Sequence, residues 1–348
     1  MRRRLQAAWE TRGWLARLLW PVSVLMAVLV AVRRALYRWG ILTRHRLPVP
    51  VVAIGNMAVG GTGKTPMAVA VVQHLQKLGR HPVVVSRGYG GTAQAPERVD
   101  PTQPAPERTG DEPLLLAQLT GAPVWVGRDR VATALAGLAA EAGADTVVLD
   151  DGMQHWRLAI DVLVVLFDER GLGNGWLLPA GLLREPWPPT TWNATCLWVQ
   201  TRAQQTGQTR ALPRHLQVHA TQRRLATTAH NRTGERVPLT NLQERGTLGA
   251  VAGIAHPNRF FEMLKAQGLV LAHQLALPDH ADASALLAGL SPGVRWLCTE
   301  KDAVKLFAAA PALDIWAVGL DTETDPAFWT ALTQSILGLS SRDGRETA

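Results

Sequence analysis

The strongest chemical signal in the sequence is a glycine-rich segment, Gly55-Asn56-Met57-Ala58-Val59-Gly60-Gly61-Thr62-Gly63-Lys64-Thr65-Pro66. It follows a short apolar run and precedes a stretch of helical character, which is the context of a phosphate-binding loop. Its glycines let backbone N–H groups turn toward phosphate oxygens, and the N-terminus of the next helix adds a favourable dipole. The segment predicts nucleotide binding by Gly60, Gly61, Thr62, Gly63, Lys64 and Thr65.

Individual positions of this loop narrow the choice of nucleotide. Lys64 would bridge the β- and γ-phosphates, and the Thr65 hydroxyl would reach Mg²⁺. Val59 stands where membrane-associated ATPases of the partitioning type carry a signature lysine, which argues against that class. An Asn-Lys-x-Asp sequence would indicate a guanine-specific switch, and the chain contains none. The sequence therefore predicts ATP with Mg²⁺ as the ligand.

A second chemical segment, residues 146–152, reads Thr-Val-Val-Leu-Asp-Asp-Gly. An apolar run that ends in carboxylates is typical of a Walker-B strand, at the edge where ligands bind in open α/β sheets. Asp150 or Asp151 would hold Mg²⁺ directly or through water, although a helix cap or a turn is an alternative. Gln154 and His155 follow at once and could line the same site; a structural role explains His155 equally well.

Three further polar segments are weaker on their own. Asp111, in Gly-Asp-Glu-Pro before a helical stretch, reads from composition alone as a helix N-cap. Glu185 follows Arg184 in a Pro-rich loop and fits an exposed ion pair with it. His280 ends a Pro-Asp-His sequence, and a lone Asp-His pair is weak evidence for a site.

Short apolar runs that alternate with helical stretches must position these residues. Continuous Val/Leu runs between helices argue for an α/β fold of the P-loop NTPase type, a mostly parallel sheet with helices on both faces. The predicted strands are Val49–Ile54, Pro82–Val85, Pro123–Val126, Thr146–Leu149, Val162–Phe167 and Cys196–Val199, and helices are expected near 65–78, 112–119 and 129–142.

Composition divides the chain into five parts. A smaller second α/β domain is expected near the C-terminus, because apolar runs at 247–254 and 294–299 flank a helical stretch. The predicted parts are an N-terminal membrane helix at 1–46, a P-loop domain at 47–200, an Arg-rich connector that fits two extended strands at 201–246, the smaller α/β domain at 247–335 and a tail at 336–348.

The positive charge is concentrated at the N-terminus. The 348 residues carry a formal net charge of +8, but residues 1–46 hold ten arginines and one acid, a net +9, so the other 302 residues sum to −1. A basic protein invites a nucleic-acid hypothesis, which the nearly neutral body argues against. The two cysteines, Cys196 and Cys298, are too few for a disulfide scaffold or a cysteine-built zinc site.

Residues 18–32 form the longest uncharged apolar run, 15 residues flanked by aromatic residues and arginines. As a helix, this run spans about 22 Å, less than the roughly 30 Å of a bilayer's hydrocarbon core. We therefore expect a helix that lies in an anionic membrane surface, with its arginines facing head groups. A transmembrane span, with Arg17 reaching the interface, and an ordinary core helix are the alternatives.

Taken together, these segments resemble those of one family, the tetraacyldisaccharide 4′-kinases of lipid A biosynthesis, as far as about residue 306. The mild departures, such as Met153 in place of Phe, remove no charged or phosphate-loop group. The resemblance rests on seven segments in order: 55–66, Ser-Arg-Gly-Tyr-Gly-Gly at 86–91, Gly-Asp-Glu-Pro at 110–113, Leu-Asp-Asp-Gly-Met-Gln-His at 149–155, Leu-Leu-Arg-Glu-Pro at 182–186, Pro-Asp-His at 278–280 and Thr-Glu-Lys-Asp-Ala-Val-Lys at 299–305.

The resemblance implies a kinase that uses ATP and Mg²⁺ to phosphorylate the 4′-hydroxyl of a tetraacylated glucosamine disaccharide 1-phosphate, giving lipid IVA. It implies that Asp111 and His280 form the acid/base pair that accepts the hydroxyl proton, with Lys64 at the phosphates. The Mg²⁺ candidates are then Thr65, Asp150, Asp151 and Glu185.

The implied partners are the membrane-embedded lipid A disaccharide precursor and an anionic membrane surface, at the cytoplasmic face of the bacterial inner membrane. Neither nucleic acid nor an obligate protein partner is expected. The alternative function is a membrane-associated P-loop ATPase switch without a sugar-lipid acceptor, in which the segments at 110–113, 182–186 and 278–280 have no role.

Overall fold

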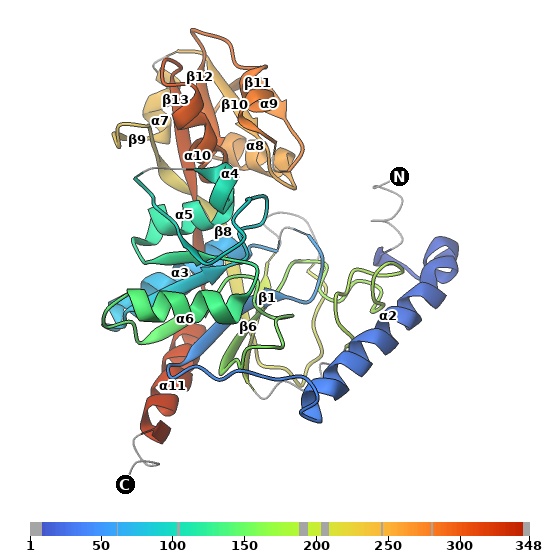
Figure 1. The fold of residues 1–348 in the computed structure, drawn as a ribbon. Coiled ribbons are helices and arrows are strands. Elements are labelled where there is room, and N and C mark those ends of the chain that lie inside the picture. Colours follow the sequence, from blue (N-terminus) through green and yellow to red (C-terminus); the bar gives the residue numbers. More distant parts are fainter. Residues whose placement is uncertain are drawn as a thin grey trace. The chain divides into compact units, whose positions relative to one another are not determined.

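The computed structural model describes residues 9–60, 62–102, 105–187, 194–202, 209–244, 246–279 and 281–343 (Figure 1). The chain forms two compact units, each assembled from segments that are distant in the sequence. Unit 1 comprises residues 1–87, 129–222 and 323–348, and unit 2 comprises residues 88–128 and 223–322.

The centre of unit 1 is a parallel sheet. Its strands are β1 (Val51–Asn56), β2 (Pro82–Ser86), β5 (Thr146–Leu149), β6 (Val162–Phe167), β7 (Thr195–Thr201) and the first part of β8 (Val218–His230). Their order is β8-β7-β6-β1-β5-β2, and each neighbouring pair is parallel. All residues of β1, β2, β5 and β6 are buried, as expected for strands covered on both faces. The parallel sheet predicted from the apolar runs is confirmed.

Three helices pack on the strands of this sheet. α3 (Lys64–Lys77) contacts β1, α6 (Arg130–Ala140) contacts β2, and α11 (Pro326–Asp343) contacts β6 and β7. The start of α6 is fixed by Asp129, whose carboxylate accepts hydrogen bonds from two N–H groups of the first turn. α3 begins at Lys64 and so places this residue near the strand ends that carry the predicted site.

Unit 1 also carries the apolar N-terminal helix, α2 (Trp14–Arg38). It is 25 residues long, and its most apolar 18-residue window has a mean hydropathy of 2.2, so by length and composition it could cross a membrane. Only 11% of that window is buried. The helix is therefore not an ordinary core helix, one of the alternatives that the sequence left open.

The strands of unit 2 are mostly parallel to one another. The strand order is β11-β10-β12-β13-β8, with β9 (Arg236–Pro238) antiparallel to β8, and β3 (Glu97–Arg98) pairs antiparallel with β4 (Val124–Val126). The remaining strands are β10 (Leu248–Ala252), β11 (Leu271–Ala276), β12 (Arg295–Thr299) and β13 (Ile315–Thr324).

Helices and two apolar clusters surround the strands of unit 2. One cluster includes Ala250 and Phe261, and the other includes Val251 and Leu306. Because neighbouring residues of a strand point to opposite faces, β10 contributes to a core on each face. The helices of unit 2 are α4 (Pro106–Thr109), α5 (Asp111–Thr120), α7 (Leu239–Glu244), α8 (Pro257–Ala266), α9 (Ala283–Leu287) and α10 (Glu300–Ala309).

The unit boundaries differ from the predicted domain boundaries. Residues 88–128, assigned from sequence to the P-loop domain at 47–200, belong to unit 2 because α5 packs against α10. The predicted connector at 201–246 contains β8 and β9, and the predicted tail at 336–348 overlaps α11. Contacts between segments far apart in the chain decide these boundaries, and local composition does not reveal them.

Candidate active site

The P-loop joins β1 to α3 in unit 1. Gly60 has a φ of 123° and Gly63, the residue before α3, has a φ of 86°, a region that residues with side chains rarely adopt. A Cβ atom at Gly60 would lie 2.8 Å from a guanidinium nitrogen of Arg170. Both glycines therefore shape the loop, which delivers Lys64 as the first residue of α3. Gly61 lies outside the described residues.

The loop offers polar groups that a phosphate would satisfy. The Thr62 hydroxyl is buried and has no hydrogen-bond partner within the described part of the chain. The first N–H groups of α3 have no acceptor within the helix, and its N-cap, Gly63, has no side chain to cap them. Thr65 stands on the first turn and is partly exposed. The residues present therefore fit a nucleotide phosphate with its Mg²⁺ ion.

Lys64 faces one of the predicted Walker-B carboxylates. Its Nζ atom lies 3.2 Å from Oδ2 of Asp151 and 3.4 Å from Oδ1 of Asn56. Burial raises the pKa of Asp151, but the positive charges of Lys64 and Arg184 outweigh burial, and the pKa is lowered overall. Asp151 is therefore ionised near neutral pH, the form that binds a cation. It adopts a positive φ of 51°, which Asp tolerates better than most residues.

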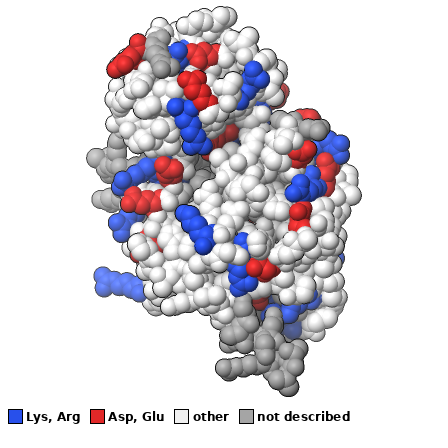
Figure 2. Space-filling view, turned by 90° about the vertical axis from the view of Figure 1, so that its left-hand side faces the viewer, with Lys and Arg blue, Asp and Glu red and all other residues white. Residues whose placement is uncertain are grey.

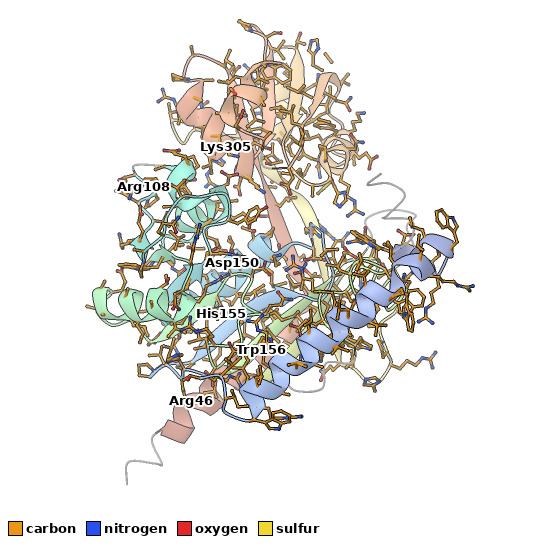
Figure 3. The ribbon with its side chains drawn as sticks, turned by 45° about the vertical axis from the view of Figure 1, so that its right-hand side comes forward. Arg46, Arg108, Asp150, His155, Trp156 and Lys305 are labelled. Atoms are coloured by element: carbon orange, nitrogen blue, oxygen red, sulfur yellow. The ribbon has the colours of Figure 1, made fainter. Side chains whose placement is uncertain are left out.

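Asp150 follows β5 directly and accepts a hydrogen bond of 3.2 Å from the Ser86 hydroxyl at the end of β2 (Figure 3). The two carboxylates stand at the C-terminal edge of the parallel sheet, where such sheets bind ligands. No group of three or more His, Cys, Asp and Glu side chains among the described residues could hold a metal ion. A P-loop Mg²⁺ ion takes one or two protein carboxylates and completes its shell with phosphates and water.

The Leu-Leu-Arg-Glu-Pro segment lies against the P-loop. Val59 donates a backbone hydrogen bond of 2.9 Å to Leu182, and Arg184 donates one of 2.8 Å to Met57. The Arg184 guanidinium also reaches Asp151 at 3.3 Å. The segment thereby ties the conformation of the P-loop to that of the Walker-B carboxylate.

Glu185 is not exposed, and the expected surface ion pair with Arg184 is wrong. Its carboxylate is buried and pairs with Arg34 of α2. The Arg34 guanidinium also lies over the Trp156 ring, 5.3 Å from its centroid. Because a guanidinium already satisfies this carboxylate, the predicted role of Glu185 as a Mg²⁺ ligand gains no support from its surroundings.

Asp111 lies in unit 2 as the first residue of α5. The N-cap of that helix is Gly110, so the N-cap interpretation of Asp111 is wrong. The Asp111 side chain is 8% exposed, and its Oδ2 atom lies 2.6 Å from Nζ of Lys305 on α10. Lys305 is labelled in Figure 3. A buried carboxylate that is kept ionised by a nearby ammonium is suited to accept a proton once a hydroxyl group is presented to it.

The glycines at 88–91 and Gly110 position the start of α5. Gly110 has a φ of 88°, and a Cβ atom there would lie 2.6 Å from the carbonyl oxygen of Tyr89. A Cβ atom at Gly91 would lie 2.3 Å from the carbonyl oxygen of Arg108. The two backbones approach too closely for side chains, which explains the glycines of both segments.

Lys301 extends the ion-pair network around α5. Its Nζ atom lies 3.4 Å from Glu112 and 3.0 Å from Asp279. Burial lowers the pKa of Lys301, but Glu112 and Asp279 raise it more, and the pKa is raised overall. His280 lies outside the described residues. Its neighbour in the chain, Asp279, shares the Lys301 ammonium with Glu112, the residue after Asp111.

Sequence reasoning did not single out several groups of the site. Arg170 is held by Asp168 at 2.6 Å and donates a hydrogen bond of 2.8 Å to the carbonyl oxygen of Val59. Asn56 and Arg184 lie inside segments that the sequence analysis had recognised, so their polar side chains were a usable signal. Arg170 lies in none of these segments.

A parallel sheet with a glycine-rich loop at a strand end, and a lysine that faces a carboxylate at the end of a neighbouring strand, define a P-loop nucleotide-binding protein. A family model for tetraacyldisaccharide-1-P 4′-kinases matches residues 15–337. The tetraacyldisaccharide 4′-kinase of Acidovorax sp. (strain JS42) is 47% identical over 97% of this chain and 96% of its own. That of Polaromonas naphthalenivorans (strain CJ2) is 45% identical over 100% of both chains.

A solved structure agrees with these relatives. LpxK from Aquifex aeolicus, crystallised in complex with ATP, matches 92% of this chain and 99% of its own, with a TM-score of 0.77 and 27% identity. The chain belongs to the tetraacyldisaccharide-1-phosphate 4′-kinase family. It is therefore an ATP- and Mg²⁺-dependent phosphotransferase of lipid A biosynthesis, and the predicted fold, family, enzyme class and cofactors are confirmed.

Proposed function

We propose that this chain transfers the γ-phosphoryl group of ATP to the 4′-hydroxyl of a tetraacylated glucosamine disaccharide 1-phosphate, with Asp111 as the proton acceptor. The observation that carries the nucleotide side is the 3.2 Å contact between Lys64 and Asp151 beside the buried, unsatisfied Thr62 hydroxyl. Phosphoryl transfer consists mainly of positioning and charge neutralisation, and these groups supply both.

On the nucleotide side, Lys64 neutralises the phosphates. The Thr65 hydroxyl, with Asp150 and Asp151, would hold Mg²⁺, whose charge stabilises the phosphate oxygens when it is bound. Glu185 acts differently in this proposal: its buried pair with Arg34 fixes the segment that contacts the P-loop.

On the acceptor side, Asp111 takes the proton of the 4′-hydroxyl. Lys305, 2.6 Å away, stabilises the carboxylate form that a base requires. By resemblance to the family, His280 is proposed as its partner.

Labelled substrate tests this function directly. Incubation with γ-labelled ATP and disaccharide 1-phosphate should place the label on the 4′-oxygen. Asp111→Asn should lower kcat by about 10²- to 10⁴-fold, the usual contribution of a general base, with unchanged ATP affinity, whereas Asp100→Asn, on an exposed loop of the same unit, should match the wild type. Hydrolysis of ATP without transfer would refute the proposal and favour the ATPase switch.

The same proposal extends to the membrane, where α2 lies in the interface and does not cross the bilayer. The helix contacts its own catalytic unit along its whole length. Just before its start, Arg12 donates a hydrogen bond of 3.1 Å to Asn174. At its middle, Ser23 donates one of 2.8 Å to Leu177, and near its end lies the Arg34 ion pair. If α2 crossed the bilayer, the polar loops that contact it would lie in the hydrocarbon core, where their backbone groups would find no water to hydrogen-bond.

Thiol accessibility distinguishes the two topologies. Glu10 and Gly40 are exposed and flank α2, and a single cysteine at either position can be labelled in sealed inverted inner-membrane vesicles. A helix on the cytoplasmic face predicts that a membrane-impermeant thiol reagent labels both Glu10→Cys and Gly40→Cys. Labelling of only one of them would indicate a span.

A further inference from the structure

Arg130 is a buried arginine that the mechanism above leaves unused. It is the first residue of α6, in unit 1, and is 8% exposed. Its Nε atom is buried and has no hydrogen-bond partner among the described residues. A buried N–H group without a hydrogen bond costs folding free energy, so this donor calls for an explanation.

The elements around α6 place Arg130 beside the Walker-B carboxylates. α6 packs on β2, whose end carries Ser86 and then Arg87, and β2 pairs with β5, which leads into Asp150. The Ser86 hydroxyl and the Asp150 carboxylate are hydrogen-bonded across these two strand ends. Charges of both signs act on Arg130. Burial and the positive charge of Arg87 lower its pKa, Asp151 and Asp150 raise it, and the pKa is lowered overall.

Two carboxylates around Arg130 are engaged by other cations. Asp129, the residue before Arg130, pairs with Arg157 at 2.9 Å. Asp151 pairs with Lys64 and with Arg184. Nε2 of His155 is a second buried polar atom that has no hydrogen-bond partner in the described part of the chain. Burial and the charge of Arg130 lower the pKa of His155 to about 4, so this ring stays neutral and adds a hydrogen-bonding group without adding charge.

We propose that the Arg130 guanidinium binds a phosphate oxyanion at the catalytic centre. A guanidinium matches the geometry of phosphate oxygens, and charge-assisted hydrogen bonds to them would satisfy the buried donor. The oxyanion is either the γ-phosphoryl group of ATP during transfer or the phosphate that the acceptor already carries. The inference rests on the proposed function, since it adds a residue to the same phosphoryl-transfer site.

The test compares Arg130→Gln and Arg130→Lys with Arg128→Gln, whose side chain lies two residues earlier and is exposed. Three quantities are measured on the full chain. Nucleotide binding is followed with Mg²⁺-ADP alone and with Mg²⁺-ADP plus aluminium fluoride, which mimics the transferring phosphoryl group. The KM for the disaccharide 1-phosphate is then measured with saturating ATP, and the thermal midpoint reports folding.

If Arg130 binds the γ-phosphoryl group, Arg130→Gln binds ADP like the wild type but loses about 100-fold in the aluminium fluoride complex and in kcat. If it binds the acceptor phosphate, the aluminium fluoride complex is unchanged and the KM for the acceptor rises about 10-fold or more. In either case Arg130→Lys recovers part of the loss and Arg128→Gln shows none.

Two results would overturn the inference. One is wild-type behaviour of Arg130→Gln in every measurement. The other is a fall of ADP affinity and thermal midpoint together, without selective loss for either phosphate, which would make Arg130 a structural residue only. Because the ADP arms need no acceptor, they remain informative even if transfer to the disaccharide fails in the wild-type protein.

Discussion

At the scale of single residues, Lys305 forms an ion pair with the buried carboxylate of Asp111. Replacing Lys305 with Met removes a positive charge that stabilises this buried carboxylate, which costs about 3–5 kcal/mol in stability. We expect Lys305→Met to lower kcat about 100-fold. The acidic limb of its pH–rate profile should also move to higher pH, because the protonated carboxyl is now favoured. Lys265→Met, on the exposed side of α8, is the matched control; an unshifted profile would argue that Lys305 is not a positioning residue.

Glu300 makes folding stability depend on pH. Burial and the charge of Asp321 raise its pKa to about 7, against a smaller opposing effect of Arg236. Between about pH 4.5 and pH 7 the folded protein holds a proton that the unfolded chain has released, so the free energy of unfolding falls as pH rises through this window.

Glu300→Gln should therefore stabilise the protein at pH 8, by about 1–3 kcal/mol, and leave its stability near pH 4 almost unchanged. Thermal midpoints across this pH range measure the effect, with Glu262→Gln, at an exposed position of α8, as the control. A constant difference between wild type and variant at all pH values would contradict this explanation.

At the scale of elements, the start of α5 depends on Gly110. Its φ of 88° and ψ of 156° are accessible to glycine and to almost no other residue, and a Cβ atom would meet the Tyr89 carbonyl oxygen at 2.6 Å. Gly110→Ala should destabilise unit 2 by about 2–4 kcal/mol and, by displacing Asp111, lower kcat.

Gly121→Ala is a suitable comparison at the other end of the same helix, because its φ is 64° but nothing lies within 4 Å of the added atom. It should cost only about 1 kcal/mol and spare activity. Equal effects of the two substitutions in urea unfolding would show that the close backbone approach is not what requires Gly110.

Local sequence patterns predicted the strands and the P-loop, but they did not predict ion pairs between distant elements. Strands β5 and β6 have the predicted bounds, because continuous apolar runs specify strands buried on both faces. The P-loop was recognisable because its function demands glycines at fixed spacing. The partners of Asp111 and Glu185 were not, since Lys305 and Arg34 lie on distant helices and no local pattern encodes such a pair.

At the scale of the whole molecule, charge and apolar surface are separated. On the face shown in Figure 2, basic and acidic side chains are interspersed over an otherwise uncharged surface, in keeping with a body that is nearly neutral beyond residue 46. The outward side of α2 instead presents aliphatic side chains that are 51–67% exposed, namely Leu18, Leu25, Leu29 and Val32. A contiguous exposed apolar face next to arginines is typical of a membrane-binding helix.

Two charges on that face should therefore release the protein from membranes. Burying one leucine contributes about 1.5–3 kcal/mol, so the double variant Leu25→Glu with Leu29→Glu should weaken binding to anionic vesicles about 100-fold or more. Leu337→Glu, an equally exposed leucine on α11, should sediment with vesicles like the wild type. The Arg34–Glu185 pair lies on the opposite, packed side of the helix, so turnover of a detergent-dispersed acceptor should persist in the double variant. Persistence of both vesicle binding and turnover would show that α2 does not provide the membrane contact.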